Sequence, residues 1–243
     1  MRSFLHSSPF VAAIAMVLAF SAAKTQASEI IDYSLDGGAT FFTLESGPSG
    51  SMLSAGSPNL GVFAVSDIHL LSNSPGGSSL AELESASLDI QNTSGATASI
   101  EFVFSDSGFT QPAGSALHMA SDIAGSVTVD NPDNLASFTS CLSATDANLT
   151  SCTGATDVDG PGFPDITASS FNNDRTLNIN SLGGPYSVTE VLDLTLGAGS
   201  DVGFNADSTI ESAATPTPEP ATWSLILLGA FLVGFKVVRR SHA

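Results

Sequence analysis

Short segments of alternating apolar and polar residues, or of a few apolar residues in a row, recur between residues 28 and 211. Gly, Pro, Asn and Ser residues bound these segments, and that combination predicts β-strands separated by turns. The segment 60–71 is long enough for two strands, and 117–129 has the pattern of one strand at each end. The predicted strand segments are 40–45, 60–71, 81–90, 97–105, 117–129, 135–142, 176–179, 187–196 and 202–210.

Side chains in a strand alternate between the two faces of a sheet, so each clear segment also predicts a buried face. The residues on these faces are Ile100, Phe102, Phe104, Leu192, Leu194 and Leu196. Segment 81–90 is rich in Ala, Leu and Glu, which favour a helix, but its alternation and its serines favour a strand, with Leu83 turned away from Glu82 and Glu84. The pattern predicts an all-β fold, an antiparallel β-sandwich of about nine or ten strands, as one domain at 28–211.

The amino-terminal segment has the pattern of a secretory signal peptide. Arg2 gives a basic start, residues 9–20 (PFVAAIAMVLAF) form an uncharged run of twelve, and small residues follow. Such a run is short for a membrane span and typical of a signal peptide. We therefore expect residues 1–27 to be removed, with cleavage after Ala27, or after Ala23 as the alternative.

The carboxyl-terminal segment has the pattern of a membrane anchor. Residues 212–217 form a Pro/Thr spacer that favours an extended chain. Residues 221–238 contain one charge, Lys236, and as a helix would measure about 27 Å, enough to cross a thin bilayer. Trp223 lies where an interfacial aromatic residue is common, and the terminal arginines fit a cytoplasmic end.

Pro218-Glu219-Pro220, the apolar run after it and the terminal arginines, in this order, resemble a PEP-CTERM sorting signal, which would occupy residues 218–243. The residues that carry the resemblance are Pro218, Glu219, Pro220, Trp223, Arg239 and Arg240. The resemblance implies exosortase as a partner and an inner-membrane anchor before processing. It also implies release to the cell surface or extracellular matrix of a Gram-negative bacterium, often together with exopolysaccharide. An ordinary single-span anchor is the alternative.

Charge narrows the function classes. The whole chain has a formal net charge of −18, but residues 28–217 hold 23 acidic residues and one basic residue, Arg175. Such a domain repels phosphate backbones and anionic lipids, so nucleic-acid binding and docking on acidic membranes are excluded.

Cys141 and Cys152 are the only cysteines, and in an exported protein a pair this close predicts a disulfide. The best metal candidate is the segment that holds Asp157, Asp159 and Asp165, which partly matches a calcium loop. The segment departs from the calcium-loop pattern, because Pro161 and Ala168 occupy positions where that pattern has ligands, and no helix precedes the segment. We expect no cofactor, with calcium at these aspartates as the alternative to a plain solvated loop.

Candidate catalytic chemistry is scarce. His69 and His118 are the histidines of the predicted domain, each beside apolar residues, and no nucleophile elbow, zinc-protease motif or phosphate loop is present. We therefore predict a non-enzymatic surface or matrix protein. A carbohydrate-binding module or a polysaccharide-active enzyme is the alternative, and the scarcity of Tyr and Trp in the domain argues against it.

Overall fold

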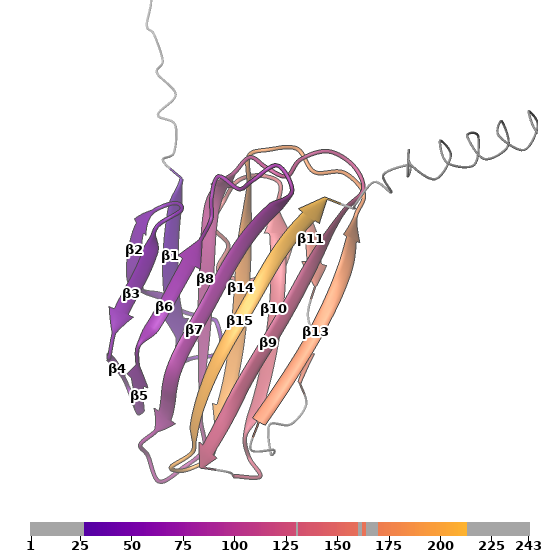
Figure 1. The fold of residues 1–243 in the computed structure, drawn as a ribbon. Coiled ribbons are helices and arrows are strands. Elements are labelled where there is room, and N and C mark those ends of the chain that lie inside the picture. The colour runs from indigo at the N-terminus through magenta and orange to yellow at the C-terminus, as the bar shows by residue number, and fades with distance from the viewer. Residues whose placement is uncertain (1–26, 130, 160–161, 164–169, 213–243) are drawn as a thin grey trace, which may run out of the picture.

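The computed structural model describes residues 27–212, apart from residues 130, 160–161 and 164–169, and every regular element in these ranges is a β-strand. They form two antiparallel sheets that pack face to face as a sandwich (Figure 1). The predicted signal peptide and sorting signal lie outside the described residues. Within those residues, no helix is long and apolar enough to cross a membrane.

The first sheet has seven strands in the order β11-β10-β14-β8-β1-β2, with β12 also paired to β10. Its strands are β1 (Ser28–Ser34), β2 (Phe42–Pro48), β8 (Ala98–Phe109), β10 (Leu135–Ser143), β11 (Asp157–Asp159), β12 (Gly162–Phe163) and β14 (Tyr186–Leu196).

The second sheet has eight strands in the order β13-β9-β15-β7-β5-β4, with β6 also paired to β7 and β3 paired to β6. Its strands are β3 (Met52–Gly56), β4 (Asn59–Leu60), β5 (Phe63–Ser66), β6 (Ile68–Ser72), β7 (Leu80–Asn92), β9 (Leu117–Val129), β13 (Ser170–Ile179) and β15 (Asp201–Ser212).

The hydrophobic core lies between the sheets and is built by the alternation of each strand. All six residues that the sequence places on buried faces of the strands at 97–105 and 187–196 are at most 2% exposed. Phe104 of the first sheet meets Phe204 of the second, with ring centroids 6.0 Å apart, and so joins the two layers. The segment 81–90 is strand, as predicted, and Leu83 is fully buried.

The structure has more strands than the predicted nine or ten, because short edge strands were missed and 60–71 is divided among β4, β5 and β6. Strands β1 and β3 had no counterpart in the prediction. The prediction of two strands in 117–129 is wrong: β9 is continuous. It is paired with β13 on one side and β15 on the other. The backbone hydrogen bonds of both ladders keep the strand extended across its small central residues.

Candidate functional site

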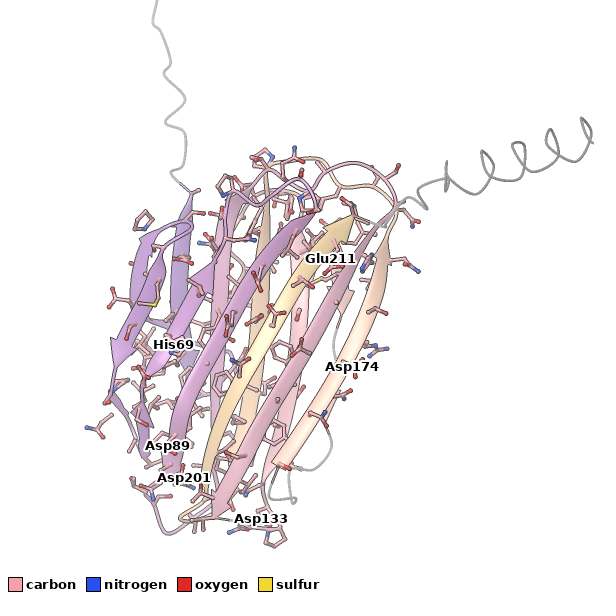
Figure 2. The ribbon with its side chains drawn as sticks, viewed as in Figure 1. His69, Asp89, Asp133, Asp174, Asp201 and Glu211 are labelled. Atoms are coloured by element: carbon pink, nitrogen blue, oxygen red, sulfur yellow. A yellow bond between two sulfur atoms is a disulfide. The ribbon has the colours of Figure 1, made fainter. Side chains whose placement is uncertain are left out.

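A row of carboxylates crosses the outer face of the second sheet. In the strand register, Asp207 of β15 lies opposite both Glu84 of β7 and Asp122 of β9, and Asp122 lies opposite Asp174 of β13. The residues beside Asp207, Asp122 and Glu84 in their strands, such as Ser208, are buried between the sheets, so these three carboxylates project to the other side. Asp174 is exposed on edge strand β13. Figure 2 shows Asp174 on this face. We call Glu84, Asp207, Asp122 and Asp174 the acidic row.

Burial and the charges of neighbouring carboxylates raise the pKa values of two members of the acidic row, Asp207 and Asp122. Burial raises the pKa of Asp207 to about 7, and the nearby Glu82, Asp122 and Glu84 add to the effect. Partial desolvation, followed by the charge of Asp174, also raises the pKa of Asp122. Asn205 on the same face donates a hydrogen bond from Nδ2 to Glu84 Oε1 at 3.1 Å.

Like charges that face each other across a ladder repel, so this arrangement favours uptake of a positive charge. Protons and divalent cations are the two chemical species that such a row can accept. At one end of the same face, His118 Nε2 lies 3.2 Å from Glu211 Oε2, and the two groups form an ion pair when the imidazole is protonated. His118 therefore contacts a carboxylate at the surface, and Figure 2 labels Glu211 at the upper end of this face.

A smaller acidic pair lies on the outer face of the first sheet. Glu101 of β8 and Asp193 of β14 are opposite each other in the register. Burial raises the pKa of Glu101 to about 7, and the charges of Asp193 and Asp36 add to this. Both outer faces of the sandwich thus present carboxylates that face one another across neighbouring strands.

Three further carboxyl groups, Glu29, Asp106 and Glu190, are fully buried between the sheets. Burial, partly offset by hydrogen bonds from Ser51, raises the pKa of Glu29 to about 7. Burial also raises the pKa of Glu190, to about 8, and the hydroxyl of Ser85 opposes this rise.

Sequence reasoning missed these three interior groups, although the alternation contains the signal. Glu190 falls on the same side of β14 as Leu192, and Asp106 falls on the same side of β8 as Phe104. A carboxyl group in phase with a buried apolar face is the pattern that identifies them.

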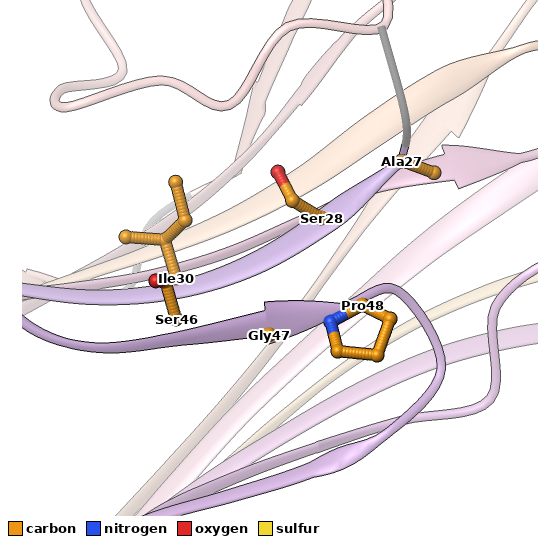
Figure 3. A pocket seen from close by; sticks show the side chains of 6 residues that line it. All are labelled: Ala27, Ser28, Ile30, Ser46, Gly47 and Pro48. Atoms are coloured by element: carbon orange, nitrogen blue, oxygen red, sulfur yellow. The ribbon is translucent and has the colours of Figure 1, made fainter.

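A pocket with a volume of about 520 Å³ lies beside β1 and β2 (Figure 3). Its lining residues are Ala27, Ser28, Ile30, Ser46, Gly47 and Pro48. Their side chains supply two hydroxyl groups and apolar surface but no carboxylate, imidazole or thiol. This lining fits a contact surface better than a catalytic cleft.

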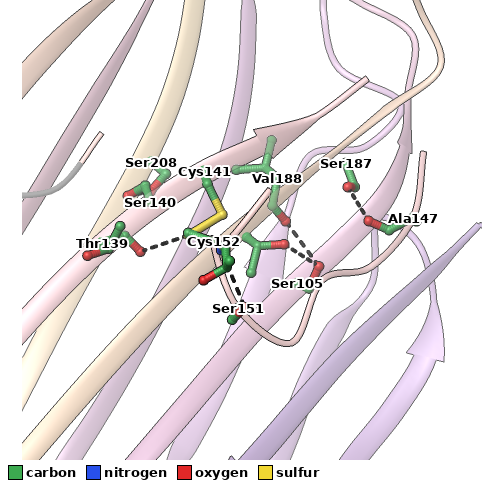
Figure 4. The surroundings of a disulfide bond; sticks show 12 residues. Ser105, Thr139, Ser140, Cys141, Ala147, Ser151, Cys152, Ser187, Val188 and Ser208 are labelled. Atoms are coloured by element: carbon green, nitrogen blue, oxygen red, sulfur yellow. Dashed lines mark hydrogen bonds between the residues drawn. A yellow bond between two sulfur atoms is a disulfide. The ribbon is translucent and has the colours of Figure 1, made fainter. Parts of the chain in front are cut away.

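The predicted disulfide is confirmed. Cys141 of β10 and Cys152 of the following loop are joined, with an S–S distance of 2.16 Å and Cα atoms 5.6 Å apart (Figure 4). Hydrogen bonds tie the same loop to the first sheet, because the Ser187 hydroxyl donates to the Ala147 carbonyl at 2.5 Å and the Ser105 hydroxyl donates to Asn148 Oδ1 at 3.2 Å. The disulfide and these bonds fix the loop on the sheet.

The predicted calcium segment is divided by the structure. Asp157 and Asp159 lie on β11, opposite Leu142 and Ser140 of β10, so this part is a strand and not the expected loop. One edge of β10 would otherwise lack a partner strand there, and β11 pairs with it. Asp165 lies outside the described residues, and no group of three or more His, Cys, Asp and Glu within the described ranges is placed to hold a metal ion.

The remaining candidates are placed as follows. His69 lies on β6, opposite Ala86 of β7, and its Nδ1 is 3.2 Å from the Asp67 carbonyl oxygen. The residues of the predicted sorting motif, Pro218 to Arg240, fall outside the described residues, so that motif stays a prediction.

No family model and no curated protein matches this chain. Among solved structures, TmCBM61 in complex with beta-1,4-galactotriose is similar at 11% identity, covering 67% of this chain and 88% of that one with a TM-score of 0.30. A cyclase from Fischerella sp. TAU is similar at 12% identity, covering 75% and 90% with a TM-score of 0.31. Infectious bursal disease virus Gx strain is similar at 12% identity, covering 74% and 35% with a TM-score of 0.33. Likenesses this distant carry no argument about function.

Proposed function

We propose that this protein is an exported, non-enzymatic surface or extracellular-matrix protein that is sorted through its carboxyl-terminal segment. The observation that carries the proposal is the order of three features near the end of the sequence. Pro218-Glu219-Pro220 comes first, the apolar run 221–235 follows, and Arg239-Arg240 comes last. By resemblance to PEP-CTERM proteins, exosortase is the processing partner, the inner membrane holds the chain before processing, and the sandwich is the cargo.

The extent of the sandwich supports this division of the chain. Its first strand begins at Ser28, directly after the favoured signal-peptide cleavage site, and its last strand ends at Ser212, where the predicted spacer begins. The start of β1 and the end of β15 lie at the same end of the sandwich (Figure 1). The predicted signal peptide and the predicted sorting signal are therefore both connected to the same end of the sandwich. The two acidic faces are left available for contacts.

The acidic faces suggest how such a cargo would meet exopolysaccharide. Carboxylates repel an anionic polymer unless a divalent cation lies between them, whereas they leave neutral sugars free to hydrogen-bond. We therefore propose exopolysaccharide as a partner, with contact through the outer faces of the sheets and not through a catalytic cleft.

Mass spectrometry of the mature protein tests the sorting proposal. In cells that carry an exosortase, we expect the residues after about Pro220 to be absent, and replacement of Pro218-Glu219-Pro220 by three alanines to leave them attached. Glu211→Gln, which changes a carboxylate seven residues before the motif, is the matched control and should be processed normally. An intact terminus ending at Ala243 in the unaltered chain would contradict the proposal. Glycan-array binding with turnover of a polysaccharide would instead show a carbohydrate-active enzyme.

A further inference from the structure

Glu29 and Asp106 form a pair of carboxyl groups inside the sandwich. Glu29 of β1 lies opposite Asp106 of β8 in the register, and both side chains are 0% exposed. The next inward residues on the two strands, Ile31 and Phe104, belong to the hydrophobic core. Side chains of directly opposed residues in an antiparallel ladder have Cβ atoms about 4.5–5.5 Å apart, so the two carboxyl groups share one space.

The turn between β2 and β3 binds one oxygen atom of each carboxyl group. Glu29 Oε2 accepts hydrogen bonds from the backbone N–H of Ser51 at 3.1 Å and from its hydroxyl at 2.6 Å. Asp106 Oδ2 accepts from the Ser49 hydroxyl at 3.1 Å and from the N–H of Gly50 at 3.2 Å. The turn thus fixes the orientation of both groups from one side.

The other oxygen atom of each group accepts no hydrogen bond from the part of the chain that the structure describes. Glu29 Oε1 and Asp106 Oδ1 are both buried without a hydrogen bond. A buried polar atom without a partner costs about 1–3 kcal/mol, and more for a charged group, so two such atoms in one space indicate a missing ligand. The Ser72 hydroxyl, buried on β6, also interacts with Asp106 and supplies a further oxygen beside it.

The strands around the pair contribute no positive side chain. Strands β1, β2, β3 and β8 contain neither Lys nor Arg nor His, and His69 of β6 contacts the Asp67 carbonyl oxygen instead. Arg175 lies on β13, at the edge of the second sheet farthest from β4 and β5, whereas β1 lies toward the opposite side of the sandwich beside β3 and β6. Within the described residues, the charge of this pair is therefore not balanced by a cationic side chain on these strands.

We infer that Glu29 and Asp106 bind a calcium ion between the sheets, through Glu29 Oε1, Asp106 Oδ1 and the Ser72 hydroxyl. An all-oxygen donor set suits a hard cation, and two carboxylates balance two positive charges. Calcium fits better than magnesium, because its shell of about 6–8 oxygen atoms is flexible and these three donors can form part of it, whereas magnesium demands a near-ideal octahedron. Extracellular modules bind calcium at about 10⁻⁴–10⁻³ M, a range that an exported protein meets.

The turn that orients the pair is built for close approach. Gly50 has a φ of +71°, and a Cβ there would lie 2.2 Å from the Ser74 carbonyl oxygen. Both the backbone conformation and the contact require glycine, so the turn lies against the neighbouring chain without a side chain between them. The site is independent of Asp157–Asp165 and of the acidic row, and only the calcium concentration that it would meet rests on the proposed export.

Thermal unfolding of the full chain tests the inference, with chelator-stripped protein measured in excess calcium and in EDTA. At a calcium concentration a hundredfold above Kd, we expect the midpoint of the unaltered chain to rise by about 5–10 °C. Glu29→Gln and Asp106→Asn should each remove this rise. The matched controls Asp174→Asn, in the acidic row, and Asp157→Asn, in the segment predicted from the sequence, should keep it. Equilibrium dialysis should show that each interior variant binds one calcium ion fewer than the unaltered chain.

The inference is overturned if the unaltered chain binds no calcium in dialysis, or if the two interior variants keep the rise. It is also overturned if Asp174→Asn or Asp157→Asn removes the rise, because the ion would then lie elsewhere. A higher midpoint for Glu29→Gln in EDTA, together with no calcium effect on the unaltered chain, would show that the pair shares a proton instead. If the interior variants do not fold, dialysis of Asp174→Asn and Asp157→Asn decides, and loss of the calcium ion in either variant overturns the inference.

Discussion

Replacing Glu190 by Gln should stabilise the sandwich at pH 8 and leave its stability unchanged at about pH 4.5. Glu190 is 0% exposed, and its Oε2 accepts a hydrogen bond from the Ser85 hydroxyl at 2.5 Å across the interior. Its Oε1 has no hydrogen-bond partner. Asp207 and Asp122, on the second sheet, add negative potential from outside. This environment favours the neutral carboxyl group, whose shape and hydrogen-bonding capacity an amide reproduces.

The magnitude follows from the change in proton affinity. Burial raises the pKa of Glu190 from 4.5 to about 8, so between these values the folded protein holds a proton that the unfolded chain has released. Stability therefore falls as pH rises from 4.5 to 8 and is constant beyond both limits. At about 1.36 kcal/mol for each factor of ten in proton affinity, the loss is at most roughly 5 kcal/mol. Gln does not titrate, so its free energy of unfolding lacks this decline.

Urea unfolding at pH 5, 6.5 and 8 measures the difference between the two chains. We expect the variant and the unaltered protein to agree within about 1 kcal/mol at pH 5 and to separate by several kcal/mol at pH 8, with the variant more stable. Glu45→Gln, a half-buried carboxylate on edge strand β2, is the control and should follow the unaltered protein at each pH. Parallel curves for Glu190→Gln and the unaltered chain from pH 5 to 8 would refute the reasoning.

Two further predictions concern the disulfide and the core. Replacing both Cys141 and Cys152 by Ala opens a loop with a sequence separation of 11 residues, which should cost about 3 kcal/mol and lower the melting temperature by about 6–12 °C. Calorimetry with and without reductant checks this, and equal midpoints would contradict it. Phe104→Ala should cost about 3–5 kcal/mol in urea unfolding, because the ring is fully buried. Phe42→Ala, at 52% exposure, should cost about 1 kcal/mol or less, and similar costs at both positions would contradict the assignment of the core.

The alternation of apolar residues predicted the sandwich because it reports directly which side chains face the interior. The inward positions of β8 and β14 were read correctly down to single residues such as Phe102 and Leu194. The disulfide was equally accessible, since two cysteines allow one pairing. Strand β1 was missed for a physical reason: the inward position that an apolar residue would normally mark is held by Glu29. A strand with a buried carboxyl group gives a weak periodic signal.

The pairing of carboxylates was beyond sequence reasoning because it depends on register. Asp122 and Asp174 are far apart in the chain and become opposite neighbours only because β13 pairs with β9 at that alignment. A shift of the strand register by one residue would move every side chain of that strand to the other face, and the carboxylates of the acidic row would no longer lie opposite one another. The same holds for Glu29 and Asp106, which a gap of more than seventy residues separates.

The strand register determines which of the many acidic residues lie next to one another, which the net charge does not show. A domain with 23 acidic residues and one arginine between residues 28 and 217 could have scattered its charges over the surface. Instead, neighbouring strands align carboxylates such as Asp207 with one another, and burial together with mutual repulsion raises their pKa values. The folded domain therefore carries less negative charge near neutral pH than its formal charge states. Each carboxyl group whose pKa is raised binds protons more tightly folded than unfolded, so lowering the pH from about 8 toward 4.5 should let these groups add to the stability of the folded state. The stability of a domain built in this way should therefore depend on pH through carboxyl groups spread over both sheets.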